Sequence, residues 1–297
     1  VIGLPMPMMR IEPKIDGLVA GLDTNKGEDV ARAIMTSDTC KKEIAVSLEI
    51  GGHRVRIGAC AKGAGMICPS MATMLCFITT DANVSAACFQ KSLLEAADTS
   101  FNRITIDGDM STNDTVIALA NGQSGMPPIK RNSKECRLFR EALEYVMLEM
   151  AKALVRDGER VTKFVTVEVK GARTYLDARK VAEAVANSAL VKSSWNGNDP
   201  NWGRIIHAVG YAQAMVREEL IDIHINGKAA CLGGLQAKTS MDTLRKVVAK
   251  DSFTITINLH LGKAEYEVYS SDLSPEYIDF NRSEYAYWKQ ARKDGLT

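Results

Sequence analysis

The sequence predicts an α+β fold in which helices are layered on mostly antiparallel sheets. Expected strands outnumber expected helices, and most strands follow one another in hairpins rather than alternating with helices along the 297 residues. At 46% hydrophobic and 25% charged, the composition is that of a globular protein with a sizeable core. Basic and acidic residues number 37 and 36, so the net charge is +1, which favours a small polar ligand over nucleic acid or a membrane surface.

The first part of the chain is expected to form a hairpin followed by a helix. Polar and apolar residues alternate over 43–50 and 53–61, and a Gly-Gly pair between them provides a tight turn. Apolar residues then recur at helical spacing as far as Asp98, and either Asp81 or Asn83 can cap this helix.

The middle of the chain predicts a long helix between a loop and a strand. Apolar residues recur every three or four positions between Ser133 and Arg156, and Gly158 is expected to end the helix. Glycines and two prolines make residues 121–130 a loop or lid, and alternation over 165–169 predicts a half-buried strand.

The last third is expected to contain one helix and then mostly strands. Helical spacing covers 177–189, and an Asn-Gly turn follows the first of three expected strands, which are 220–225, 253–261 and 264–270. A composition shift near 186–194 divides the chain into a larger domain, 1–185, and a smaller α/β domain, 186–297.

The seven cysteines contain no Cys-x-x-Cys pair and fit no zinc-site spacing. We therefore expect reduced thiols, no metal site and a cytoplasmic location. The first residues have neither the basic region nor the apolar core of a signal peptide, and the chain starts without methionine, so we expect further residues upstream.

One 18-residue stretch, Gly63 to Thr80, contains no charge. Its glycines, proline and threonines make it a poor membrane helix, so we expect a buried segment rich in backbone contacts. The position of Lys62, before the glycines instead of after them, argues against a phosphate-binding loop. Within the stretch, Ala72-Thr73 is a plausible self-cleavage site, where the hydroxyl would attack the preceding carbonyl and leave Thr73 as a new N-terminus.

Five blocks, in order, resemble the ornithine acetyltransferase family, also called the bifunctional glutamate N-acetyltransferases. The nucleophile segment of that family is similar to Lys62-Gly-Ala-Gly-Met-Ile-Cys-Pro-Ser-Met-Ala-Thr73. The other similar blocks are Val1-Ile-Gly-Leu-Pro-Met-Pro-Met, Ala33-Ile-Met-Thr36-Ser-Asp-Thr, Phe101-Asn-Arg-Ile-Thr-Ile-Asp107-Gly-Asp109-Met-Ser-Thr-Asn-Asp114-Thr and Lys192-Ser-Ser-Trp-Asn-Gly-Asn-Asp199-Pro-Asn-Trp-Gly-Arg204.

The resemblance implies a self-cleaving acyltransferase with Thr73 as nucleophile and its freed α-amine as base. The implied reaction moves an acetyl group from N2-acetylornithine to glutamate through an acetyl-threonine ester, in arginine biosynthesis. The implied fold is an α/β/β/α sandwich shared with the self-cleaving aminopeptidases. It also implies that the chain is the later part of a longer precursor, because the family's oxyanion Thr-Gly would lie immediately before Val1.

The resemblance also implies a set of substrate-binding residues. Cleavage after Ala72 exposes Thr73, and the matched binding positions are Thr36, Lys62, Thr73, Glu159 and Asn281. Family chains usually end soon after that asparagine with a terminal threonine, whereas this chain continues, so Ser283 is the nearest hydroxyl that could replace it. No metal or organic cofactor is implied, although acetyl-CoA could be a second donor. The expected partners are small substrates, the two cleavage products associated with each other, and further copies of the chain.

Three alternatives remain open at this stage. The same nucleophile could transfer its acyl group to water, as in an N-terminal-nucleophile amidohydrolase or aminopeptidase. Asp107, Asp109 and Asp199 could belong to a metal-dependent phosphatase, although Thr112 and Ala118 break the calcium-loop pattern and leave a turn or scaffold as the simpler interpretation. The chain could also be a fragment without activity.

Overall fold

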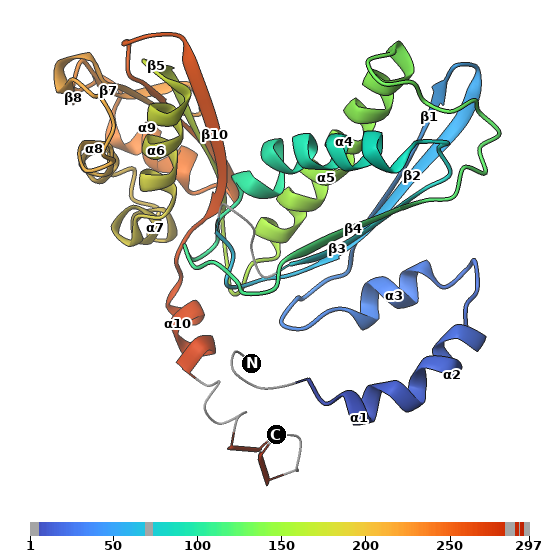
Figure 1. Ribbon diagram of the computed structural model, residues 1–297. Helices are drawn as coiled ribbons and strands as arrows, with labels where there is room; N and C mark the ends of the chain where they lie inside the picture. Colours follow the sequence, from blue (N-terminus) through green and yellow to red (C-terminus); the bar gives the residue numbers. More distant parts are fainter. Residues whose placement is uncertain (1–5, 69–73, 283–288, 291, 294–297) are drawn as a thin grey trace.

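The structure is a computed structural model that describes residues 6–68, 74–282, 289–290 and 292–293. Figure 1 shows two lobes that meet at an angle, each built from one sheet with helices packed on it. The first sheet has the order β1-β2-β3-β4 and the second the order β10-β5-β9-β6-β7-β8. The predicted α+β class is therefore confirmed.

The first lobe is built on a four-stranded sheet. Its strands are β1 (Lys42–Ile50), β2 (His53–Lys62), β3 (Leu75–Thr80) and β4 (Thr115–Ala120). β1, β2 and β3 pair in antiparallel fashion, whereas β4 runs parallel to β3. The predicted hairpin is confirmed, and Gly51 and Gly52 adopt positive φ angles of 59° and 81° in its turn. Strand β4 was not among the predicted strands.

Two helices cover one face of this sheet, α4 (Ala86–Thr99) and α5 (Lys134–Arg156). Both begin at a serine, because Ser85 and Ser133 each accept the backbone N–H three residues on. The prediction that Asp81 or Asn83 caps α4 is therefore wrong. The helices bury an apolar core that includes Ile57, Phe139 and Leu143, none of which is exposed to solvent. Residues 121–130 form the predicted loop.

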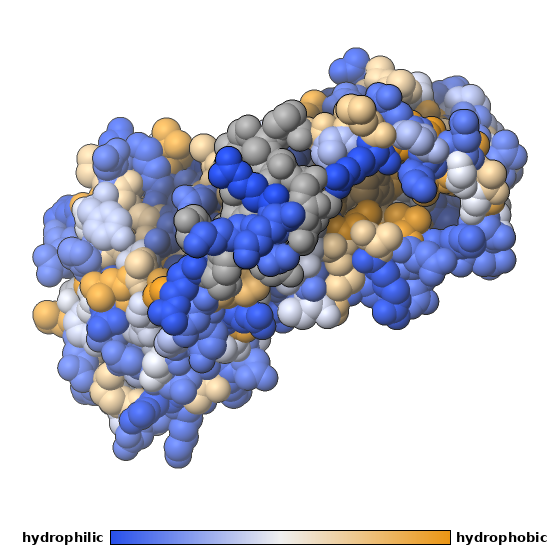
Figure 2. Space-filling view, turned by 90° about the horizontal axis from the view of Figure 1, so that it is seen from below, coloured by the Kyte–Doolittle hydropathy of each residue, from blue (hydrophilic) through white to orange (hydrophobic). Residues whose placement is uncertain are grey.

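The opposite face of the first sheet is largely open in the described part of the chain. Ile117 and Leu119 of β4 point outward and are 43% and 63% exposed. Short helices lie below this face in Figure 1, namely α1 (Met8–Ile11), η1 (Glu12–Lys14), α2 (Ile15–Ala20) and α3 (Gly27–Ala33). Figure 2, seen from that side, shows hydrophobic surface over this lobe.

The second lobe contains a six-stranded sheet in which only β5 and β9 are parallel neighbours. Its elements, in chain order, are β5 (Phe164–Ala172), α6 (Tyr175–Ala186), α7 (Ala189–Asn196), α8 (Trp202–Gly210), η3 (Glu218–Leu220), β6 (Asp222–Ile225), β7 (Lys228–Leu232), β8 (Leu235–Gln236), α9 (Met241–Val248), β9 (Ser252–Asn258) and β10 (Ala264–Ser271).

Helices cover the apolar face of this second sheet. Val165, Val167 and Val169 alternate along β5 and are completely buried, with α6 packed against β5 and β10. The predicted helix 177–189 stops at Ala186, because Ser188 caps a separate helix, α7. Helices α7, α8 and α9 were not predicted, and they lie in the region expected to be mostly strands.

The two lobes are joined by η2 (Phe101–Arg103), by α5 and by the residues that follow β10. Ile104 bridges to Tyr269 of β10, and the chain then continues into α10 (Pro275–Arg282), which lies below the junction in Figure 1. Sheet and core both change at β5, whereas the domain division after residue 185 stays a prediction. None of the helices within the described ranges is long and apolar enough to cross a membrane.

Candidate active site

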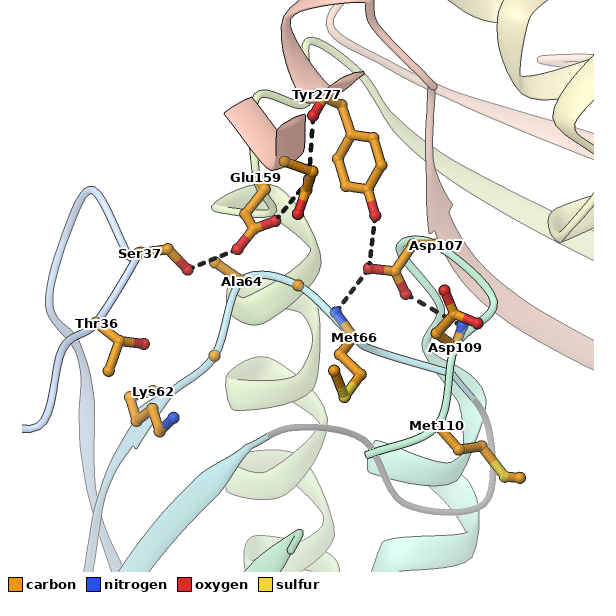
Figure 3. Close-up of a pocket in the computed structure, with 13 residues that line it drawn as sticks. Thr36, Ser37, Lys62, Ala64, Met66, Asp107, Asp109, Met110, Glu159 and Tyr277 are labelled. Atoms are coloured by element: carbon orange, nitrogen blue, oxygen red, sulfur yellow. Dashed lines mark hydrogen bonds between the residues drawn. The ribbon is translucent and has the colours of Figure 1, made fainter. Parts of the chain in front are cut away.

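A pocket of about 480 Å³ lies at the junction of the lobes. Its walls come from the loop before β1, the end of β2, the loop before β4, the residues after α5, and α10. Figure 3 shows Thr36 and Lys62 at one end, Asp107 and Asp109 at the other, and Glu159 between them. The lining residues are Thr36, Ser37, Lys62, Gly63, Ala64, Gly65, Met66, Asp107, Asp109, Met110, Glu159, Tyr277 and Asn281.

Three buried charged side chains hold one end of this pocket. Lys42, only 3% exposed, donates to Asp38 at 2.6 Å and also to Asp157 at the C-cap of α5. Asp38 additionally accepts the backbone N–H of Thr36 at 3.0 Å and that of Gly63 at 2.8 Å. One carboxylate therefore fixes the loop before β1 against the end of β2.

The second carboxylate of this network ties the same loop to α5. Asp157 accepts the backbone N–H groups of Thr39 and Cys40 as well as the Thr39 hydroxyl. Burial raises the pKa values of Asp38 and Asp157, but hydrogen bonds from Lys42 and from the backbone outweigh it and hold both pKa values below the ordinary one. The two carboxylates are thus ionised around a buried ammonium group.

Glu159 occupies the middle of the pocket with both carboxylate oxygens engaged. Ser37 donates to one oxygen at 2.8 Å, and the amide nitrogen of Asn281 donates to the other at 3.2 Å. The backbone N–H of Glu159 donates to Ala64 at 2.7 Å, so the glycine-rich segment after β2 runs directly beside it. A Cβ atom at Gly65 would lie 2.5 Å from this carboxylate, and only glycine therefore allows so close an approach.

Asp107 organises the opposite end of the pocket. Its carboxylate accepts the backbone N–H of Met66 at 2.6 Å and that of Ile67 at 2.9 Å, and the Tyr277 hydroxyl donates to it at 3.2 Å. Burial, followed by the negative charge of Asp107, raises the pKa of Tyr277, so the phenol keeps its proton as a donor. The hydrogen bonds give Asp107 the scaffold role that was one of its sequence interpretations.

A further carboxylate connects the second lobe to the pocket. Asp272, 2% exposed, accepts the backbone N–H groups of Thr162 and Lys163 at 2.8 and 2.9 Å, and the side chain of Asn196 at 2.7 Å. It therefore fixes the segment just after Glu159 to the end of β10, from which α10 continues.

Comparisons with known proteins identify the family. The model of the ArgJ family matches residues 1–286. The chain belongs to the ArgJ family. It is 47% identical to the arginine biosynthesis bifunctional protein ArgJ of Geobacter sulfurreducens, and the match covers 95% of this chain and 72% of that one. It is 44% identical to the glutamate N-acetyltransferase of Methanocaldococcus jannaschii, again over 95% of this chain and 72% of that one.

A crystal structure of the ArgJ protein from Bacillus halodurans has the same architecture. The TM-score is 0.66 at 35% sequence identity, and the match covers 69% of this chain and 96% of that chain. This agreement supports both the α+β class and the ArgJ resemblance found in the sequence.

The structure brings four of the predicted binding residues together. Thr36, Lys62, Glu159 and Asn281 come from segments as far apart as 245 residues in the numbering, yet all of them line one pocket. Their roles in substrate binding stay predictions, as do those of the predicted residues that lie outside the described ones, Ala72, Thr73 and Ser283.

Several residues that line or support this pocket were not predicted from the sequence. The local sequence does contain an indication of Asp157. A carboxylate at the C-terminus of a helix interacts unfavourably with the helix dipole, which indicates that a tertiary contact stabilises it there. Lys42 and Asp38 are four residues apart, which is ordinary for a surface pair, and nothing in the sequence marks them as buried. Tyr277 lies in an otherwise exposed helix, α10, without any marker.

The described residues contain no group of three or more His, Cys, Asp or Glu side chains placed to hold a metal ion. All seven cysteines are free thiols in the structure. The pocket is lined by hydroxyl, amide, ammonium and carboxylate groups, with the charges of Lys62 and Glu159 opposite in sign.

Proposed function

We propose that this protein transfers an acetyl group from N2-acetylornithine to glutamate, with Thr73 as the nucleophile. The hydroxyl of Thr73 attacks the acetyl carbonyl, the amide C–N bond breaks, and ornithine leaves with the proton on its amine. The amine of glutamate then attacks the resulting ester, the C–O bond breaks, and the proton returns to the threonine oxygen. The net reaction conserves the acetyl group and requires no metal or organic cofactor.

We also propose that the chain activates itself by cleavage between Ala72 and Thr73. Cleavage frees an α-amine beside the hydroxyl, and this amine acts as the base. An α-amine has an ordinary pKa of about 7.7–8.0, so at neutral pH only a minority is unprotonated. A nearby cation such as Lys62 lowers that pKa and increases the unprotonated fraction.

The single observation that supports this proposal is the convergence of the four matched residues on one pocket beside the start of β3. Lys62, the last residue of β2, pairs in register with Leu75, the first residue of β3, two positions after Thr73. Glu159 supplies a carboxylate for the ammonium group of ornithine, and Lys62 an ammonium group for a substrate carboxylate. The names of the ArgJ relatives agree with arginine biosynthesis and glutamate acetylation.

The fold also supports continued association of the two cleavage products. β2 lies before the proposed cut and β3 after it, and the two strands pair from Ile57–Thr80 to Lys62–Leu75. Backbone hydrogen bonds and the shared core would therefore hold the products together. We further propose that the enzyme is cytoplasmic and forms higher homo-oligomers. We also propose that acetyl-CoA can serve as a second acetyl donor.

Mass spectrometry and an acetyl-transfer assay test this function together. Intact protein should split into two parts, one starting at Thr73, and Thr73→Ala should abolish both the splitting and the glutamate-dependent consumption of N-acetylornithine. Thr79→Ala is the matched control, because Thr79 is an exposed threonine of β3 away from the pocket, and it should behave as wild type. Continued splitting in Thr73→Ala would disprove the mechanism.

The same assay separates the alternatives. Release of acetate at a rate that does not depend on glutamate would identify an amidohydrolase instead of a transferase. Adding acetyl-CoA without N-acetylornithine tests the second donor, because N-acetylglutamate forms only if the nucleophile also accepts that thioester.

A further inference from the structure

A single loop holds the chain on both sides of the nucleophile position. Residues 104–114 connect η2 to β4, and one of them, Asp107, accepts the backbone N–H groups of Met66 and Ile67, which precede Thr73. The last member, Asp114, accepts the backbone N–H of Met74 at 2.8 Å, and Met74 is the residue bonded to Thr73. Carboxylates of one loop thus fix both flanks, although they are about 40 positions away in the chain.

From this geometry we propose that Asp114 is a positioning residue, which orients Thr73 for self-cleavage and acetyl transfer by fixing the peptide group of Met74. The inference rests on the proposed function, because it assigns Asp114 to the nucleophile of that reaction. Asp114 does not itself touch substrate in this proposal.

Both peptide groups that flank Met74 are fixed by hydrogen bonds. Its N–H donates to Asp114, and its carbonyl accepts the N–H of Thr115 at 3.1 Å. Regular parallel pairing of β3 with β4 begins one residue later, at Leu75 and Thr115. The Asp114 carboxylate therefore extends the hydrogen bonding of this strand pair by one position toward Thr73.

The burial of Met74 makes this anchor rigid. Its side chain is 2% exposed and belongs to the core of the first lobe, so the backbone cannot shift without disturbing that core. Nucleophilic attack needs the reacting atoms about 3–3.5 Å apart, and a misplacement of ~1 Å can cost about a hundredfold in rate. An anchor on the peptide group that joins Met74 to Thr73 is well placed to set that distance.

The charge of Asp114 is sensitive to pH. Partial burial raises its pKa to about 6, against the opposing effects of the Met74 N–H, the positive charge of Lys62 on β2 and the Ser111 hydroxyl of its own loop. At neutral pH the carboxylate is mainly ionised and makes a charge-assisted hydrogen bond. Protonation weakens this bond, so the anchor loosens as pH falls through about 6.

Two substitutions separate the hydrogen bond from the charge. Asp114→Ala removes the acceptor, and we expect at least a tenfold slower self-cleavage and a similarly lower kcat, while KM for glutamate changes less than about threefold. Asp114→Asn keeps a neutral oxygen that can accept from Met74, so it should be faster than Asp114→Ala and should cleave at about the rate of wild type below pH 6. Asp98→Asn, at an exposed carboxylate of α4, is the matched control and should match wild type.

The pH dependence of self-cleavage provides a readout that a purely structural role would not change. Before cleavage Thr73 has no free amine, so its later titration cannot mask that of Asp114. Wild-type self-cleavage should slow as pH falls through about 6. Asp114→Asn should lose this dependence, because an amide does not titrate in that range.

The outcomes distinguish this inference from the proposed function. If wild type cleaves and Thr73→Ala does not, but Asp114→Ala cleaves at the wild-type rate, Asp114 has no positioning role and the function stands. If Asp114→Asn is as slow as Asp114→Ala and both melt at a lower temperature than wild type, the residue is only structural and the inference is overturned. If wild type neither cleaves nor transfers acetyl groups, the proposed function fails and takes this inference with it.

Discussion

The two lobes each contain a buried lysine, and the two lysines have different surroundings. Lys42, in the first lobe, contacts two carboxylates, Asp38 and Asp157. Lys192, in the second lobe, is 3% exposed and donates to neutral oxygens, the hydroxyl of Ser270 at 3.2 Å and the carbonyl and hydroxyl of Ser271.

The difference separates a paired charge from an unpaired one. Removal from water lowers the pKa of Lys192 to about 7, and the negative charges of Asp272 and Asp107 oppose this shift without cancelling it. In the first lobe the ammonium group instead holds the pKa values of its two carboxylates below the ordinary one. Both lysines fix segments that reach the pocket, but only Lys42 does so by pairing with opposite charges. The end of the pocket that Lys42 holds contains Thr36 and Lys62, which are predicted to bind substrate.

The largest effect should come from breaking the paired network. Asp157→Ala leaves Lys42 with one carboxylate and removes the acceptor of two backbone N–H groups in the loop before β1. Loss of one partner of a buried ion pair typically costs about 3–5 kcal/mol of the free energy of unfolding. Urea denaturation monitored by circular dichroism measures this cost.

Two control variants provide reference values for that loss of stability. Asp98→Asn, an exposed carboxylate, should change the free energy of unfolding by less than about 0.5 kcal/mol. Lys192→Met leaves the Ser271 carbonyl without its donor but removes no partner charge, so roughly 1–3 kcal/mol is expected. An Asp157→Ala loss no larger than that of Lys192→Met would contradict the distinction between the two lysines.

The pH dependence of stability should differ between the two networks in the pH range where it acts, although in both ranges stability rises with pH. Asp38 and Asp157 have lowered folded pKa values, so the unfolded state binds more protons as pH falls below 3.8 and stability is lost there. Lys192 releases its proton above about 7 when folded but near 10.5 when unfolded, so stability rises with pH between those values. Each effect is specific to one lobe.

Crossed variants sharpen this test. Unfolding midpoints measured from acid to alkaline pH should show that Asp157→Asn weakens the acid loss and keeps the alkaline rise. Lys192→Met should do the reverse. If both variants follow the wild-type profile, neither network determines the pH dependence.

The smallest effect on stability should come from Gly65→Ala, which acts on the pocket itself. The added methyl group would lie 2.5 Å from the Glu159 carboxylate, and the flexible side chain can swing away at little cost to the fold. Because the Glu159 carboxylate is then displaced, KM for N-acetylornithine should rise about tenfold, equivalent to about 1.4 kcal/mol. The unfolding midpoint should be almost unchanged. An unchanged KM would remove Glu159 from the binding site.

The sequence predicted the elements with strong periodicity and the residues with specific motifs. The hairpin of β1 and β2 and the long helix α5 were confirmed because their patterns are long and regular. β4 was missed because Thr115–Ala120 lies beside a turn-rich segment and has a weakly alternating pattern. Helix α4 is capped by Ser85 and not by Asp81 or Asn83, since the local sequence contains several possible caps.

The candidate site was predictable only in part. The resemblance to a known family predicted Thr36, Lys62, Glu159 and Asn281 as binding residues, and all four line one pocket. The groups that hold them, such as Asp157, depend on contacts more than 100 positions away in the chain, which periodicity and local motifs do not encode.

The most direct test of the account is the intact mass of the cleaved protein after incubation with N2-acetylornithine alone. We predict one acetyl group on the part that begins at Thr73, attached to that threonine, and its disappearance when glutamate is added. An unmodified Thr73, or an acetyl group that glutamate does not remove, would contradict the account.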